Sequence, residues 1–196
     1  MIAGHFATAL LPKARHPELP MVWLLTAAQL PDFLWIVLGF LGIEAPEPAS
    51  LLDATFANIR VQMTFSHDVL PTLGVAACFG AIVLLAGKGR RLAGWCAALV
   101  LLHLGCDLVS GFEHHLCGPS SPAVGLATYT RAPHVALAIE TLVSLLCVTY
   151  YDAALRRRGT PLARGRRLAL YGVLVGGILI WWPTATIPLT DMLHLR

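Results

Sequence analysis

Charged side chains are scarce in this 196-residue chain: they make up 13% of it, against about 25% in an ordinary soluble domain. Hydrophobic residues make up 57%. This balance excludes a disordered chain and a nucleic-acid-binding module, and it argues against most soluble enzymes. The five cysteines are odd in number and none are spaced as Cys-x-x-Cys, which excludes a disulfide framework and a sulfur-rich zinc site. A glycine-rich phosphate loop is also lacking.

Long apolar runs take up much of the chain instead. Each run holds about 20 residues, enough for a helix to cross a hydrocarbon core of about 30 Å. A segment in lipid must satisfy its own backbone hydrogen bonds, so the runs predict helices. We expect an all-α, polytopic integral membrane bundle of about five transmembrane helices that forms a single domain over residues 1–196. The runs are Met21–Ile43, Asp68–Gly87, Leu92–Phe112, His134–Leu155 and Leu168–Leu189.

The opening stretch Ile2–Leu11 is apolar but too short to span, because ten residues of helix cover about 15 Å. No basic residue precedes it, so we do not expect a cleaved signal peptide. We expect a short, half-inserted N-terminal helix.

Basic residues fall into three short segments, and basic loops stay on the cytoplasmic side of a membrane. All three share one side if the N-terminal segment is cytoplasmic and the C-terminus lies outside. We therefore predict a multi-pass protein of the inner (cytoplasmic) membrane in that orientation. Its partner is the lipid bilayer, and no nucleic acid partner is expected. The segments are Lys13–Arg15, Lys88–Arg91 and Arg156–Arg167.

Ionisable residues lie inside these runs, where a charge costs about 2.5–3.5 kcal/mol on insertion scales. No Lys or Arg lies inside any run. The acids must therefore be protonated, paired with a histidinium, or bound to a cation. Carboxylate and imidazole groups are also the ligands of Zn²⁺ in catalytic sites. The candidates are Asp32, His103, Asp107 and Glu140, with His67 and Asp68 at the outer end of the second run.

The spacing of these candidates supports a shared site. His103 and Asp107 are four residues apart, which places them on one face of a helix. Pro31 removes a backbone donor directly before Asp32, so we expect a disturbed helix there. The loop pair His114–His115 is expected to be solvated.

Depth in the membrane brings further residues to the site. Counted at 1.5 Å per residue, Asp32 and His103 lie about equally far from the cytoplasmic ends of their runs. His5 reaches a comparable depth if the N-terminal helix is half-inserted. His67 joins the group only if the second run bends inward, for instance at Pro71.

At these residues the sequence resembles a bacterial family of small integral membrane proteins, the membrane-bound metal-dependent hydrolases or YdjM-like proteins. The resemblance covers roughly residues 2–140, and Glu140 matches an acidic position. Some members carry a histidine four residues after the last aspartate, where this chain has Gly111. The matching motifs are Gly4-His5, Leu30-Pro31-Asp32, Phe65-Ser66-His67-Asp68 and His103-Leu104-Gly105-Cys106-Asp107.

Three functions are compatible with these observations. The first is a membrane-embedded metal-dependent hydrolase that acts on a lipidic or amphiphilic substrate through a metal-activated water, with Asp68 or Glu140 as the proton shuttle. The second is a cation- or proton-coupled transporter, since intramembrane acids also mark ion pathways. The third is a non-catalytic scaffold. The sequence does not specify an oligomeric state. The expected ligands of a divalent metal ion, for which we favour Zn²⁺, are His5, Asp32, His67, His103 and Asp107.

Overall fold

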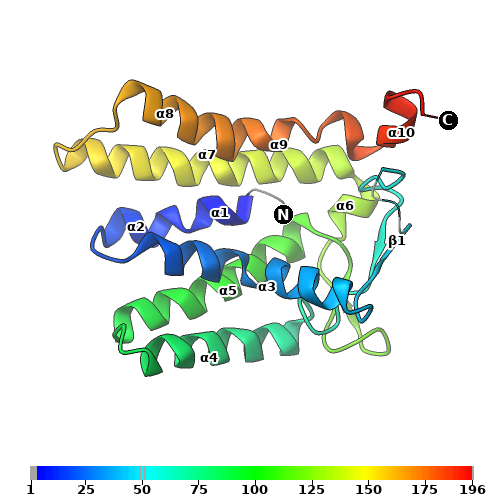
Figure 1. Ribbon diagram of the computed structural model, residues 1–196, viewed down its shortest axis with the longest axis horizontal. Helices are drawn as coiled ribbons and strands as arrows, with labels where there is room; N and C mark the ends of the chain where they lie inside the picture. The colour runs from blue at the N-terminus through cyan, green and yellow to red at the C-terminus, as the bar shows by residue number, and fades with distance from the viewer. Residues whose placement is uncertain (1–3, 49, 51, 196) are drawn as a thin grey trace.

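The computed structural model describes residues 4–48, 50 and 52–195. The chain is mostly helical, with two short antiparallel strand pairs, β1–β2 and β3–β4 (Figure 1). The all-α class is therefore confirmed. In chain order the elements are α1 Gly4–Thr8, α2 Leu10–Arg15, α3 Met21–Phe40, β1 Pro46–Glu47, β2 Arg60–Val61, α4 Val69–Leu85, α5 Arg90–Ser110, β3 His114–His115, β4 Ala123–Val124, α6 Thr128–Arg131, α7 Pro133–Arg157, α8 Arg164–Tyr171, a π-helix Gly172–Gly176, α9 Gly177–Leu179, a 3₁₀ turn Pro183–Ala185 and α10 Leu189–Met192.

Among the described residues, three helices are long and apolar enough to cross a membrane: α3, α5 and α7. This is fewer than the five expected. The helix of the second run, α4, is apolar but has only 17 residues, because the chain before Val69 folds into turns.

The fifth run is not one α-helix. It begins in α8, passes through the π-helical stretch and ends as α9 at Leu179. Glycines at positions 172, 176 and 177 weaken the regular helix, since glycine loses the most backbone freedom on folding. Pro183 and Pro188 lack the amide hydrogen that would continue a helix. The C-terminal part of the run is therefore split into short turns.

The N-terminal segment forms the short helix that was expected, divided into α1 and α2 at Ala9. Pro12 has no amide hydrogen to donate to the carbonyl of Thr8, which explains the division. Both pieces lie between α3 and α7 (Figure 1). His5 and Ala7 are fully buried there. The surroundings of this helix are thus mainly other helices of the bundle.

The two ends of the bundle differ in charge. The end of α2, the α4–α5 turn and the α7–α8 turn lie together at one end, whereas the strands, α6 and α10 lie at the other (Figure 1). At the first end Arg91 pairs with Glu18 at 3.2 Å, and Arg158 donates to the carbonyl of Ala14. All three basic segments are therefore gathered at one end, as the charge pattern predicts.

Packing inside the bundle and contact with lipid use different faces of the same helices. One core cluster joins α3, α4 and α5 and includes Leu24, Val83 and Leu99. A second joins α6, α7 and α9. Large apolar side chains point outward as well, with Phe40 89% and Leu85 88% exposed. Helices that are apolar all round are typical of a bundle surrounded by lipid.

Replacing Leu99 by alanine should lower the free energy of unfolding by about 2–5 kcal/mol, because it leaves a cavity between α3, α4 and α5. The matched control is Leu101→Ala on the same helix, whose side chain is 41% exposed. That side chain meets lipid or detergent, so its loss should have a much smaller effect. The measurement is reversible unfolding in detergent, and equal effects of the two changes would contradict this packing.

Candidate metal centre

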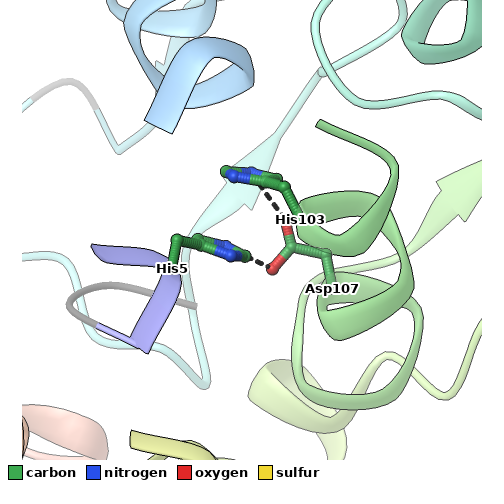
Figure 2. Close-up of side chains that lie close together, drawn as sticks. All are labelled: His5, His103 and Asp107. Carbon is green, nitrogen blue, oxygen red and sulfur yellow. Dashed lines mark hydrogen bonds and ion pairs between the residues drawn. The ribbon is translucent and has the colours of Figure 1, made fainter. Parts of the chain in front are cut away.

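Five side chains from four segments meet in the middle of the bundle. We call them the His/Asp cluster. His5 comes from α1, Asp32 from the middle of α3, His67 from the turn before α4, and His103 with Asp107 from adjacent turns of α5. Figure 2 shows the imidazoles of His5 and His103 both directed at the Asp107 carboxylate. All five residues predicted as metal ligands are thus brought together.

Four donor atoms of the cluster surround one point. They are Nε2 of His67, Nε2 of His103, Oδ1 of Asp32 and Oδ2 of Asp107. His67 Nε2 lies 3.2 Å from His103 Nε2, 3.2 Å from Asp32 and 3.7 Å from Asp107. His103 Nε2 lies 3.2 Å from Asp107 and 3.8 Å from Asp32. Ligands at about 2.0–2.1 Å from a tetrahedral Zn²⁺ are about 3.3 Å apart, so the three separations among Asp32, His67 and His103 fit one such ion.

Hydrogen bonds outside the cluster fix the tautomers of two histidines. His103 Nδ1 donates to the carbonyl of Ala28 at 2.7 Å, because a carbonyl only accepts. The Ser66 hydroxyl donates to Glu44 Oε2 at 2.6 Å, so it accepts from His67 Nδ1 at 2.8 Å. In the neutral rings both Nε2 atoms then carry lone pairs. Two lone pairs facing one another at 3.2 Å repel unless a proton or a metal ion lies between them.

Asp32 and His67 reach the cluster differently from expectation. Helix α3 runs through Pro31 without a break, and Gln29 donates to Asp32 Oδ2 at 2.9 Å. The second run does not bend at Pro71, which lies within α4. Instead, His67 precedes α4 in a turn held by the buried Glu44 carboxylate, which accepts from the backbone amides of residues 65 and 66.

His5 contacts the cluster at its edge. Its Nε2 lies 3.1 Å from Asp107 Oδ1, and its ring stacks on that of His103 with centroids 3.4 Å apart. His5, His103 and Asp107 form one group able to hold a metal ion, and Asp32, His67 and His103 form another. His103 belongs to both and has only its Nε2 available, since Nδ1 is bound to Ala28. The two groups therefore describe one centre.

The two predicted proton carriers lie outside this centre. The Asp68 carboxylate accepts from the amides of His115 at 2.8 Å and Gly118 at 2.6 Å. The Glu140 carboxylate accepts from the amide of Gly4 at 2.9 Å and from the hydroxyl of Tyr129 at 2.7 Å. Both carboxylates therefore hold backbone: Glu140 holds the residue directly before His5, and Asp68 holds residues 115 and 118.

One buried histidine was not expected near the site. His114 is 1% exposed and stacks on His67 with ring centroids 5.9 Å apart. Burial lowers the pKa of His114 to about 4, so its ring is neutral at physiological pH. Its neighbour His115 is only partly buried, and the two alternate in β3. An alternation of buried and more exposed residues is the sequence pattern of a strand, and it would have indicated that His114 is buried. A strand of two residues is too short for that pattern to be recognised.

A cavity of about 540 Å³ opens onto the His/Asp cluster. Asp32, His67 and Asp107 line it, and Asp32 is the ligand with the most exposed side chain at 26%. Its walls are largely apolar, and no Lys or Arg is among the described residues that line it. The wall residues include Trp35, Ile36, Phe56, Ile59, Val61, Met63, Phe112, Trp181 and Leu189.

Position 111, one turn after Asp107, has no room for a side chain. A Cβ on Gly111 would come within 2.9 Å of the Asp107 Cα. The fold therefore needs glycine there.

These features define a helical membrane protein with a buried group of histidines and aspartates able to hold a metal ion. No family model, curated protein or solved structure matches the chain.

The hydrogen bonds that connect Glu44, Ser66 and His67 predict that substitutions at these residues weaken metal binding. Ser66→Ala removes the acceptor that orients His67, and Glu44→Gln removes the carboxylate that orients Ser66. Each should weaken binding of Zn²⁺ by about 10–100-fold, as is usual for groups that orient a ligand. Affinity is measured by competition with a chelator in detergent. The control Glu113→Gln changes a side chain that is 55% exposed and should have no effect. Unchanged affinity in Ser66→Ala, with normal circular dichroism, would disprove this role.

Proposed function

We propose that this chain is a membrane-embedded metal-dependent hydrolase that acts on a lipidic or amphiphilic substrate through a metal-activated water. The observation that carries the proposal is a set of three donors, from Asp32, His67 and His103, that is able to hold one metal ion beside an apolar cavity. This arrangement supports kinship with the membrane-bound metal-dependent hydrolases that the sequence resembles.

Zinc is the metal we propose, because the two imidazole donors and one carboxylate donor of His67, His103 and Asp32 suit its tetrahedral geometry and leave the fourth position for a water. When bound, such an ion lowers the pKa of its water to about 7 and so supplies a nucleophile. The chain's own residues position that chemistry. Asp32, His67 and Asp107 face the cavity, whereas His103 is closed off by packing.

Of the two expected proton shuttles, we favour Glu140. Tyr129 lines the cavity and donates its hydroxyl hydrogen to Glu140 Oε2, which links that carboxylate to the reaction space. Asp68 has no such link among the described residues, and its carboxylate is directed at the backbone of residues 115 and 118.

The metal content of the purified protein tests the site. We expect about one zinc per chain in the wild type and none in His103→Ala/Asp107→Ala, measured by elemental analysis. The control His16→Ala changes a histidine outside the cluster and should keep the metal.

Hydrolysis of a panel of acyl esters and phosphoesters of lipids should then depend on the metal and increase as the pH rises through about 7. Metal without hydrolysis of any panel member at any pH would refute the enzyme, and no metal in the wild type would favour a proton-coupled transporter or a scaffold.

We also propose the membrane orientation. The basic end of the bundle lies in the cytoplasm and the end with the cavity and strands lies outside, in the inner membrane of a bacterium. If α4 and the helical stretch from α8 to α9 also cross, the chain makes five crossings, with the N-terminal segment inside and the C-terminus outside.

Cysteine labelling tests this orientation. Cys117 is exposed in the loop at the strand end, so a membrane-impermeant maleimide should label it in intact cells when it is the only cysteine left. The matched variant carries Thr160→Cys, in the exposed α7–α8 turn, as its only cysteine. It should be labelled only after the cells are permeabilised. The reverse pattern would invert the proposed topology.

A further inference from the structure

A second pocket lies directly beside the apolar cavity. Its volume is about 260 Å³, and it shares Ile59, Val61 and Phe112 with the cavity as common walls. Its other lining residues include Arg60, Thr130 and Arg131. The cavity is lined mainly by apolar side chains, whereas the smaller pocket is lined by two arginines, and the two spaces share part of their lining. We call the smaller pocket the arginine pocket.

The two arginines come from two different loops. The first outer loop, Glu44–Asp68, contains Arg60 as its only Lys or Arg, and the second, Glu113–Pro133, contains Arg131 as its only one. Outer loops avoid basic residues. Nevertheless, the fold brings these two arginines from distant parts of the chain to line the same pocket.

Two acidic residues lie near this pair. Glu113 lines the same pocket, and Glu47 is the strand partner of Arg60. Among the described residues, neither carboxylate forms an ion pair with Arg60 or Arg131. Glu113 instead lies 3.7 Å from His115 Nε2. Two guanidinium groups without a carboxylate partner are suited to a phosphate-like group, which they can bind through several N–H donors.

We propose that the arginine pocket binds the anionic headgroup of an amphiphile whose apolar chain fills the cavity. This inference rests on the proposed function and makes its substrate more specific: the substrate carries a phosphate-like charge away from its apolar part. The two spaces share Ile59, Val61 and Phe112 as lining, so the proposed molecule extends past these three side chains from one space into the other. The bond to be hydrolysed then faces the His/Asp cluster on the floor of the cavity.

The experiment compares two probes of equal chain length, dodecylphosphonate and dodecanol, which differ in the anionic group. Trp35 and Trp181 line the cavity, so quenching of tryptophan fluorescence in the detergent-solubilised protein reports binding. Affinities are measured before and after a chelator removes metal, so that binding to the arginines is separated from binding to the metal. We expect dodecylphosphonate to bind at least tenfold more tightly than dodecanol in both states.

Variants show where the preference arises. Arg60→Gln/Arg131→Gln should reduce it to less than twofold, whereas Arg60→Lys/Arg131→Lys should keep most of it. The control Arg164→Gln/Arg167→Gln removes two arginines at the opposite end of the bundle and should leave it unchanged. Inorganic phosphate should not bind at concentrations that saturate with dodecylphosphonate, because it lacks the apolar chain.

Several results would overturn the inference. These are equal affinity for the two probes, a preference that survives in Arg60→Gln/Arg131→Gln, loss of the preference in the control, and binding of inorganic phosphate as tight as that of dodecylphosphonate. A preference that disappears with the chelator but persists in the double variant would assign the anion to the metal, which leaves the hydrolase proposal standing. An arginine-dependent preference in a protein without metal or hydrolysis would support the pocket and refute the hydrolase.

Discussion

The structure depends on one electrostatic constraint: Asp32 and Asp107 lie inside an apolar bundle, and the apolar runs of its helices contain no Lys or Arg to neutralise them. A carboxylate taken out of water is stable only when it is protonated, paired or bound to a cation. Three histidines approach these two acids, and the hydrogen bonds of His67 and His103 leave their Nε2 lone pairs directed at one point. When these rings are neutral, their lone pairs add to the negative charge of the two carboxylates, and the group is then able to hold a metal ion.

Three further buried carboxylates serve this centre by holding backbone. Glu140 accepts from the amide of Gly4, directly before His5, and Glu44 accepts from the amides of residues 65 and 66, directly before His67. Asp68 accepts from the amides of residues 115 and 118, next to the buried His114. Each of these acids therefore fixes an irregular segment or a helix start that regular packing would leave loose. A site built from a short N-terminal helix and a turn needs such anchors, because its ligands are not all on long helices.

The sequence predicted the parts of this centre that follow from helical periodicity. His103 and Asp107 share a face because they are four residues apart, and Asp32 lies at matching depth because both helices begin at the same end of the bundle. The common end of the three basic segments followed from charge alone. Features set by irregular backbone were not predictable in this way. His67 enters through a turn held by Glu44, Asp68 and Glu140 bind amides instead of facing the cluster, and the fifth apolar run is interrupted where glycine and proline outweigh its hydropathy.

The way the cluster is closed bears on its chemistry. A structural zinc site surrounds its ion with four protein ligands, whereas a catalytic site keeps one position open to water or substrate. Here His103 and Asp107 are 1% and 3% exposed, although Asp107 also borders the cavity. The Asp32 side chain is 26% exposed and borders the cavity, and its second oxygen is held by Gln29. Under the proposed function, water and substrate reach the ion from the cavity side, where Asp32 is the most accessible ligand. The accessible ligand and the space for an amphiphile then coincide, as the hydrolase proposal requires.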